Sequence, residues 1–249
     1  MIRLHRLSPY IVGLLVLTAC AGPGGGLGVP DCGSDRGAVE APVVKPGDVW
    51  KYRQINDYTK IDQGVFQLQV TDSSPAGIQA RLTLPGGSTA AETYDRTWGW
   101  KTVSNRGWDW LSPLAYGSPT VEFSPPFDST PFPLRVGQTW SNNVVAVDPS
   151  TGGRTAIQIS SSARCWEKIT VPAGAFVALR IERRSYVQDI QWWKSQTTLR
   201  QVDWYLPEVN RVVMTWHDTH YDDYRQRPES MQIRGDRLRW ELLEYKPGK

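Results

Sequence analysis

Apolar and polar residues alternate with a period of two through much of this chain. In the segments 66–70 and 78–84 every second residue is apolar, and residues 72–77 between them have the Asp, Ser, Pro and Gly composition of a turn. A two-residue period places all the apolar side chains of a strand on one face. No segment shows the periodicity of an amphipathic helix convincingly. The sequence therefore predicts an all-β chain in which the mature part contains little or no helix.

Three further turns predict antiparallel hairpins in the second half of the chain. They are Pro172-Ala173-Gly174, which precedes a strand at 175–182; residues 207–210, between strands at 201–206 and 211–216; and Gly235-Asp236, between strands at 231–234 and 237–245. Pro fixes φ for the first position of a turn, and Gly accepts the left-handed conformation that short hairpins need. The chain is thus predicted to end as a strand.

The opening of the folded body is echoed once along the chain. Residues 45–50 resemble residues 135–140, and residues 74–77 resemble residues 171–174, in the same order. We therefore predict two related antiparallel units that form curved sheets of a half-barrel or sandwich type. The first unit spans 42–132 and the second spans 133–249. The alternative is a coincidence of common turn residues.

The stretch between these units is rich in proline and phenylalanine. Five prolines fall within residues 118–133. Because proline cannot donate a ladder hydrogen bond, this stretch is predicted to be a crossover loop. A partner-docking edge is the alternative interpretation.

The N-terminus has the three-part layout of a secretory signal. Arg3 and Arg6 precede an apolar run at 11–17, and Leu17-Thr18-Ala19-Cys20 resembles the lipobox of bacterial lipoproteins. The resemblance implies a signal peptide at 1–19, cleavage before Cys20 and attachment of lipid, palmitate included, to its thiol. Residues 20–41, rich in Gly and Pro, would then be a flexible tether. The alternative is an ordinary secretory signal with an incidental cysteine.

The residue after Cys20 bears on location. It is Ala21 and not Asp, and in enterobacterial lipoproteins this implies transfer to the outer membrane. The expected position is the cell envelope, lipid-anchored, facing the periplasm. Two further cysteines, Cys32 and Cys165, are an even pair in an oxidising compartment, which favours a disulfide. Two free thiols are the alternative, because a sequence cannot show the distance between them.

Composition excludes several functions. The formal charge falls from +3 to +1 once Arg3 and Arg6 are removed with the signal, so nucleic acid is not an expected partner. No nucleophile elbow, phosphate-binding glycine loop, Cys-x-x-Cys or His-Glu-x-x-His motif is present. We therefore expect a protein that is not an enzyme and needs no cofactor. The expected partners are the membrane, reached through lipid on Cys20, and an envelope protein, lipid or glycan.

Two clusters of residues are candidate sites. Trp98, Trp100, Trp108 and Trp110 crowd one segment, and aromatic side chains near polar ones can form a platform for sugars. Alternating core positions of two strands are the other interpretation. Residues 217–223 contain alternating His and Asp, but side chains two apart on a flat strand are about 7 Å apart, too far to share one ion. A polar strand end is the favoured interpretation there, with no metal.

Three stretches carry a family resemblance. Residues 132–140, 171–182 and 204–213 resemble uncharacterised proteobacterial lipoproteins, which are similar to the curved antiparallel sheets of periplasmic lipoprotein carriers. The resemblance covers about 133–245 well, and it implies a curved sheet without a catalytic residue. The carriers place helices in their concave face, and no such helix is predicted here.

These observations lead to two hypotheses. The first is a membrane-anchored, non-enzymatic interaction or envelope-maintenance module in the periplasm. The second is a binding protein that holds a hydrophobic or glycan ligand in the concavity of its sheets. A binding protein requires a cavity lined by Trp, whereas an interaction module would be filled by its own side chains.

Overall fold

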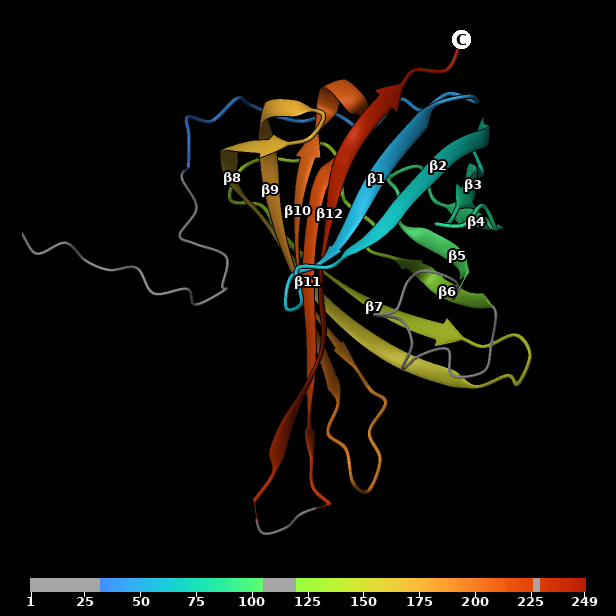
Figure 1. Cartoon of the computed structure of the whole chain (residues 1–249), viewed down its shortest axis with the longest axis vertical. Helices are drawn as coiled ribbons and strands as arrows, with labels where there is room; N and C mark the ends of the chain where they lie inside the picture. The colour runs from blue at the N-terminus through green and yellow to red at the C-terminus, as the bar shows by residue number, and fades with distance from the viewer. Residues whose placement is uncertain (1–31, 105–119, 226–228) are drawn as a thin grey trace, which may run out of the picture.

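The computed structural model describes residues 32–104, 120–225 and 229–249, which form a barrel of antiparallel strands (Figure 1). The strands are β1 (Val49–Asn56), β2 (Asp62–Ser74), β3 (Gly77–Thr83), β4 (Thr89–Tyr94), β5 (Trp100–Ser104), β6 (Thr120–Phe127), β7 (Thr139–Val147), β8 (Arg154–Val171), β9 (Gly174–Val187), β10 (Thr197–Leu206), β11 (Arg211–Asp223) and β12 (Met231–Lys246). The described part contains one short 3-10 helix, η2 (Pro207–Val209). The prediction of an all-β chain with curved sheets is confirmed.

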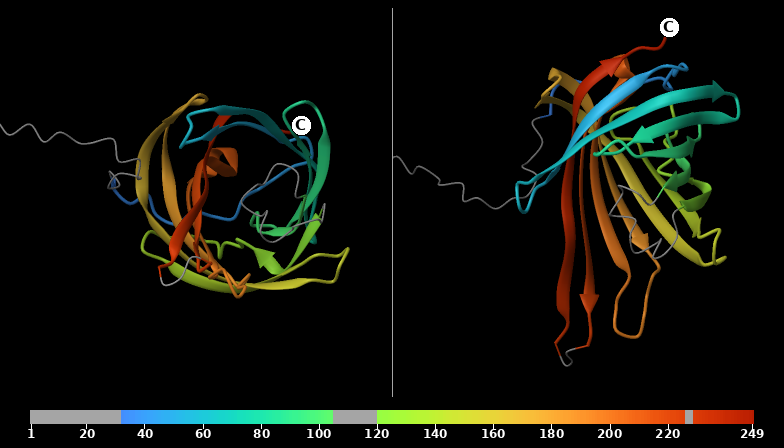
Figure 2. Two further views of the ribbon diagram at one scale, coloured as in Figure 1. Left: turned by 60° about the horizontal axis from the view of Figure 1, so that its bottom comes forward. Right: turned by 45° about the vertical axis from the view of Figure 1, so that its right-hand side comes forward.

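The barrel is closed by its first and last strands. Each strand pairs with the next along the chain, and β1 pairs with both β2 and β12. Trp50, for example, lies opposite Leu68 of β2 and Tyr245 of β12. Closure leaves no free sheet edge along the barrel wall, which removes a common route to aggregation. The left view of Figure 2 looks along the barrel and shows its ring of strands.

Alternation along the strands separates an interior face from an exterior face. In β1 the residues at even positions are buried and those at odd positions are only partly buried. A large cluster of apolar side chains, including Trp50, Phe66 and Leu82, fills much of the interior. A smaller cluster joins Val39, before β1, to Leu134, and the two residues exchange backbone hydrogen bonds of 2.8 Å. This pairing holds the segment that follows β6 against the barrel.

Two of the three predicted turns are confirmed. Residues 172–173 connect β8 to β9, and η2 connects β10 to β11. Asn210 ends η2 in the left-handed conformation, with φ at 55°, which asparagine tolerates better than most residues.

The third predicted turn is wrong. Gly235 and Asp236 lie inside β12, which runs unbroken from Met231 to Lys246. A Cβ atom at Gly235 would lie 2.1 Å from Oγ1 of Thr219, and the β11 register shifts at that point, between Asp218 and His220. Glycine is therefore required for a close approach of two strands, and its turn-like appearance in the sequence is misleading.

The two predicted units share one barrel. The range 42–132 supplies β1 to β6 and the range 133–249 supplies β7 to β12. The units join where β6 pairs with β7, with Phe123 opposite Ala146. Their relation as an internal repeat stays a prediction. The proline-rich stretch is not wholly a loop, because it contains β6, whose prolines lie where its pairing with β7 has ended.

A disulfide attaches the start of the described chain to the barrel. Cys32 bonds to Cys165 of β8, with their Cα atoms 5.4 Å apart, a separation typical of disulfides. Gly33 donates a backbone hydrogen bond of 2.7 Å to the carbonyl of Trp166. Within the described ranges, no helix is long and apolar enough to cross a bilayer.

Candidate functional site

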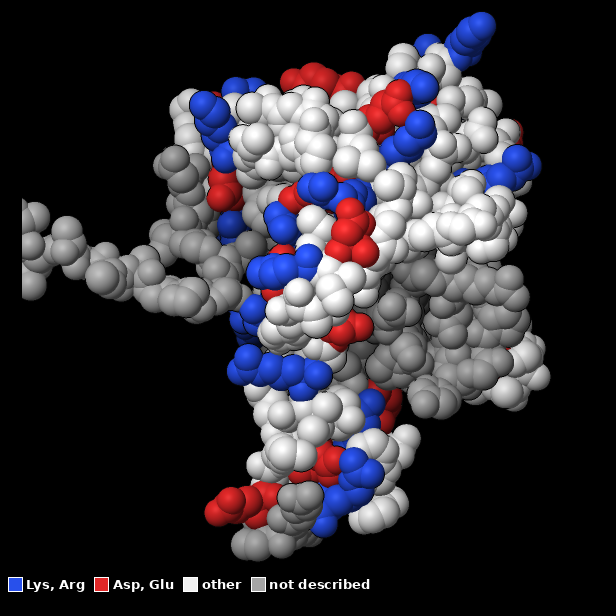
Figure 3. Space-filling view, in the orientation of Figure 1, with Lys and Arg blue, Asp and Glu red and all other residues white. Residues whose placement is uncertain are grey.

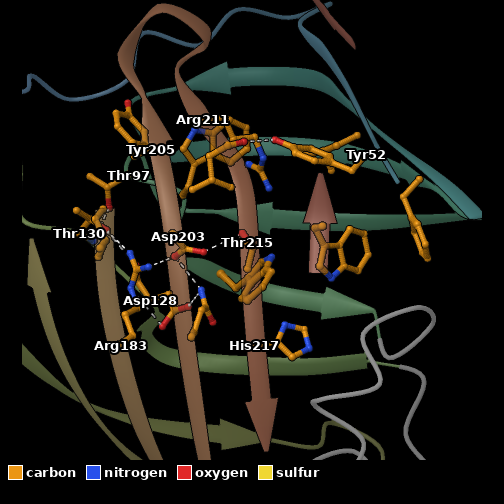
Figure 4. Close-up of a pocket in the computed structure, with 18 of the residues that line it drawn as sticks. Tyr52, Thr97, Asp128, Thr130, Arg183, Asp203, Tyr205, Arg211, Thr215 and His217 are labelled. Carbon is orange, nitrogen blue, oxygen red and sulfur yellow. Dashed lines mark hydrogen bonds and ion pairs between the residues drawn. The ribbon is translucent and has the colours of Figure 1, made fainter. Parts of the chain in front are cut away.

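A cavity of about 120 Å³ lies inside the barrel and has one apolar and one polar wall (Figure 4). The apolar side chains are Tyr52, Phe66, Leu68, Leu82, Trp100 and Trp240. The polar side chains include Asp128, Thr130, Arg183, Gln201, Asp203 and Thr215. Strands β1 to β3 supply most of the first wall and β9 to β11 most of the second, so the cavity lies between opposite sides of the barrel.

The β4–β5 loop places Trp98 in this cavity. The carboxylate of Asp95 accepts hydrogen bonds from the backbone N–H groups of Thr97 (2.7 Å) and Gly99 (2.8 Å). A Cβ atom at Gly99 would lie 2.4 Å from Oγ of Ser129, so the loop packs too closely on that segment for any other residue. Trp98 then donates from Nε1 to the backbone carbonyl of Asn210, at 2.8 Å, on the far side of the interior.

The structure places two of the four predicted tryptophans together at the cavity. Trp98 and Trp100 both line it, and Trp100 is 8% exposed and belongs to the apolar core. The two interpretations of the sequence are therefore compatible for this pair, because the core residues are also the walls. Trp108 and Trp110 lie outside the described residues, as does Cys20.

A buried network of charges crosses the polar wall. Arg183 and Asp203 form an ion pair between β9 and β10, with their side chains 6% and 5% exposed. Asp203 also accepts hydrogen bonds from Thr215 (2.8 Å) and Gln201 (2.9 Å), and Arg183 donates to Thr130 at 3.1 Å. Figure 4 shows these side chains pointing toward one another. Asp203 is thus fully compensated, as a buried charge needs to be.

Asp128 is less well compensated than Asp203. Its Oδ2 accepts one hydrogen bond from Gln201, at 3.2 Å, and its Oδ1 has no hydrogen-bond partner among the described residues and lies 3.9 Å from Nε of Arg183. Burial raises the pKa of Asp128 to about 6, although the nearby Arg183 lowers it in part. This carboxyl group therefore has an acceptor oxygen available to a ligand.

Arg211 is a cation enclosed by aromatic rings. Its guanidinium lies 3.9 Å from the ring centre of Trp98, 5.6 Å from that of Tyr94 and 5.8 Å from that of Trp50. Its Nε and Nη1 are buried without a hydrogen-bond partner in the described part of the chain. Aromatic faces attract a cation, but they do not satisfy N–H donors that lie in the plane of the guanidinium.

Two further groups at the cavity have pKa values shifted by burial. Burial raises the pKa of Tyr52 to about 12, and this tyrosine donates to the carbonyl of Val212 at 2.6 Å. Burial lowers the pKa of His217 to about 3. At neutral pH the tyrosine hydroxyl and the imidazole are therefore uncharged, and the charges at the cavity belong to the carboxylates and arginines.

Backbone strain is concentrated at this site. Trp98 and Asp128 adopt left-handed conformations, with φ at 68° and 61°, and both line the cavity. Such conformations are costly for a bulky residue and persist only where the surroundings enforce them. At Trp98 and Asp128 the backbone conformation therefore places side chains at the cavity at a cost in local stability.

The His and Asp residues of 217–223 lie in different surroundings. The carboxylate of Asp218 accepts a hydrogen bond of 3.4 Å from Arg237, and His217 lines the cavity. In the ranges that the structure describes, no three His, Cys, Asp or Glu side chains gather in a way that could hold a metal ion.

Sequence reasoning did not find the polar wall. Gln201 and Asp203 lie on the face of β10 opposite Val202, Trp204 and Leu206, so alternation assigns them to solvent. A signal was present for Arg183, because it follows Leu179 and Ile181 on the same alternating face. In the structure β10 is buried on both faces from Gln201 to Leu206, so its polar face is inside as well.

Comparison with known proteins supports the fold. No protein-family model matches the sequence, and no curated protein matches it. A crystal structure of a protein from Parabacteroides distasonis, provisionally described as a lipoprotein, aligns with a TM-score of 0.52 at 18% identity, over 85% of this chain and 100% of that one. A protein from Bacteroides fragilis, provisionally described as exported and as having a YmcC-like fold, aligns with a TM-score of 0.50 at 12% identity, over 84% of this chain and 100% of that one. The lipoprotein YmcC of Escherichia coli aligns with a TM-score of 0.40 at 8% identity, over 82% of this chain and 86% of that one. At these identities the chain is similar to exported proteins and lipoproteins in its fold.

Proposed function

We propose that this chain is a non-enzymatic binding protein of the cell envelope, anchored by lipid on Cys20, whose barrel interior holds one ring of a glycan ligand. The lipobox-like residues 17–20 support the anchor, and the fold is one that exported proteins and lipoproteins share. The cavity supports the binding role, because an interaction module would fill its interior with its own side chains. A cavity of about 150 Å³ accommodates benzene, so one of about 120 Å³ leaves room for no more than one ring.

The observation that carries this proposal is the unused hydrogen-bonding capacity at the cavity. Two donor nitrogens of Arg211, Nε and Nη1, and one oxygen of Asp128 are buried without hydrogen-bond partners in the described residues. A buried polar group without a partner costs about 1–3 kcal/mol, and more when it is charged. A ligand with acceptors and hydroxyl donors would recover that cost on binding.

The same observation favours a glycan over a purely apolar ligand. A hydrocarbon would pack against Phe66 and Leu82 but would exclude water from Asp128 and Arg211 without replacing its hydrogen bonds. A sugar ring has an apolar face of C–H groups, which packs on aromatic rings such as Trp98, and a rim of hydroxyls. A sugar that carries a carboxylate would suit Arg211 best, because charge-assisted hydrogen bonds are the strongest.

The proposal is tested on the body secreted without its anchor, from Ala21 to Lys249. Tryptophan fluorescence is titrated with soluble cell-wall fragments that contain acidic sugars, and with palmitate as an apolar competitor. We expect the fragments to quench the fluorescence, Arg211→Met to weaken their binding at least tenfold, and Leu82→Trp, which fills the cavity, to abolish it. Arg135→Met is the matched control, because Arg135 is exposed and outside the cavity.

Two results would reject the glycan. Binding of palmitate alone would assign the cavity to hydrophobic ligands. Binding of neither compound, with no change on filling the cavity, would favour the interaction module. The anchor is tested separately: Cys20→Ser should abolish labelling with radioactive palmitate and release the protein from the membrane fraction.

A further inference from the structure

Two arginines lie directly opposite each other on the outer face of the barrel. Arg184 of β9 pairs in register with Arg200 of β10, and both side chains are exposed. They alternate with Arg183 and Gln201, which line the interior cavity. Figure 3 shows, in the orientation of Figure 1, that basic and acidic side chains are interleaved down the middle of the face it presents.

These two arginines differ from their basic neighbours in forming no ion pair within the described residues, although Asp218 of β11 lies opposite Arg200 in register. Arg164 lies 3.5 Å from Glu182, and Arg237 lies 3.4 Å from Asp218. In the part of the chain that the structure describes, neither Arg184 nor Arg200 forms an ion pair. Like charges opposite each other destabilise a sheet, and an anion bound between them would relieve that repulsion.

The pair lies in a large groove lined with hydroxyl groups. The groove has a volume of about 1130 Å³, and the hydroxyl groups of Ser160, Ser162 and Tyr186 line it together with both arginines. Ser160 is directly opposite Arg184. Guanidinium and hydroxyl groups together are the donors that bind phosphate oxygens.

The same hairpin carries exposed apolar residues at its end. The loop between β9 and β10 contains Trp192, which is 82% exposed, and Ile190, which is 61% exposed. The right view of Figure 2 shows this loop at the lower end of the barrel, beside the end of the β11–β12 hairpin. A tryptophan beside basic residues is typical of surfaces that contact the membrane interface.

The disulfide brings this face close to the proposed anchor. Cys32 is held at Cys165 of β8, next to Arg164 in the groove. Eleven residues, 21–31, separate Cys20 from Cys32. The twelve residue steps from Cys20 to Cys32 span at most about 40 Å, so an anchor at Cys20 would lie within that distance of the β8 side.

We propose that the outer face of the β9–β10 hairpin docks on the membrane to which the chain is anchored, with anionic phospholipid headgroups between Arg184 and Arg200 and with Trp192 at the interface. The proposal uses the anchor at Cys20 but is independent of the ligand in the cavity. Docking would fix the orientation of the barrel relative to the membrane, so that it presents a constant face to the periplasm.

The test uses the body from Ala21 onward, because all twelve strands lie within 49–246 and the barrel does not need the anchor. Co-sedimentation is measured with vesicles of phosphatidylcholine alone and with vesicles that contain 30% phosphatidylglycerol. We expect partition into the anionic vesicles only, weakened by salt. Replacing both arginines, Arg184→Gln with Arg200→Gln, should lower this partition about thirty-fold.

Matched controls are available on other parts of the barrel. Arg81 and Arg96 are exposed, on β3 and in the β4–β5 loop, so Arg81→Gln with Arg96→Gln removes the same charge and should leave partition unchanged. Ile190→Ser and Trp192→Ser should both weaken vesicle binding. Ile61 is 60% exposed in the β1–β2 loop, so Ile61→Ser is the control for Ile190→Ser.

Several results would overturn the proposal. One is an absence of partition into vesicles, and another is an equal loss of partition in the Arg184→Gln, Arg200→Gln variant and in the Arg81→Gln, Arg96→Gln control. A third is release from vesicles by millimolar inorganic phosphate, which would make the groove a site for soluble anions. Retention on an immobilised anionic polysaccharide, lost in the Arg184→Gln, Arg200→Gln variant, without partition into vesicles would assign the groove to a glycan.

Discussion

The inner and outer faces of strands β9 and β10 use the same residue type in opposite ways. Arg183 and Arg184 are neighbours in the sequence, yet Arg183 is buried and ion-paired with Asp203, whereas Arg184 is exposed opposite Arg200. The pleat of a strand sends neighbouring side chains to opposite faces. The inner arginine is part of the architecture of the cavity, and the outer one is available to a partner.

One sheet can therefore carry two sites, one on each of its faces. Charges in the interior need partners of their own, because burial without compensation is costly, and those partners come from β6, β10 and β11. Charges on the exterior are solvated and need none. Substitutions on the inner face should therefore change stability more than substitutions on the outer face.

Asp203→Ala should have the largest effect on stability. It leaves Arg183 buried without its carboxylate, and breaking such a pair costs about 3–5 kcal/mol. The free energy of unfolding is measured by urea denaturation with tryptophan fluorescence. A loss below about 1 kcal/mol would show that water reaches Arg183 and that the inner face is not sealed.

Asp128→Asn should stabilise the protein at neutral pH. The pKa of Asp128 is about 6 in the folded state against an ordinary value of 3.8, so between those values the folded state holds more protons than the unfolded state and stability falls as pH rises. The cost above pH 6 is about 2–3 kcal/mol, and the variant should recover it. Asparagine also tolerates the left-handed backbone at this position.

The same variant should bind ligand less well, because the acceptor oxygen is part of the proposed site. Urea denaturation at pH 4.5 and pH 7.5 measures the first effect, and the glycan titration measures the second. A variant with wild-type stability at both pH values would contradict the burial of this carboxyl group.

His217→Gln should remove a loss of stability in acid. The pKa of His217 is lowered to about 3 in the folded state, so below the ordinary value of 6.5 the unfolded state takes up a proton and the folded state does not. The wild type should therefore lose about 2 kcal/mol between pH 6.5 and pH 5 through this residue. Thermal unfolding at the two pH values checks this, and a wild-type slope in His217→Gln would contradict it.

Arg184→Gln and Arg200→Gln, together, should have the smallest effect on stability. Both side chains are exposed and without ion pairs in the described residues, so the free energy of unfolding should change by less than about 0.5 kcal/mol. Relief of their mutual repulsion makes a slight gain the expected sign. A loss comparable to that of Asp203→Ala would remove the contrast between the two faces.

Local patterns predicted much of the strand structure. The two-residue period marked the regions of β2 and β3, and the turn residues at 172–174 and 207–210 marked the β8–β9 turn and the β10–β11 hairpin, because these signals depend on neighbours in the sequence. The same local signals failed at Gly235, whose role depends on Thr219 in another strand. Closure of the barrel depends on pairing between β1 and β12, which no local signal records.

The site was predicted in part. Trp98 and Trp100 stood out because four tryptophans crowd one segment near polar residues, which can form a platform for sugars. Arg211, Asp128 and Asp203 did not stand out, because a charged residue in an alternating strand looks like a solvated one until the curvature of the sheet is known. The cavity is created by closure, and its polar wall could be found only once both faces of β10 were seen to be buried.

The most direct test of the account is the mass of the protein as the cell delivers it. The body from Ala21 to Lys249 is secreted to the periplasm, purified without denaturant, and measured by native and by denaturing mass spectrometry, in the wild-type form and as Arg211→Met. The account predicts an additional mass on the wild type that disappears on denaturation and is reduced in Arg211→Met. A bare polypeptide mass for the wild type, unchanged after incubation with cell-wall fragments, would contradict a binding function of the barrel interior.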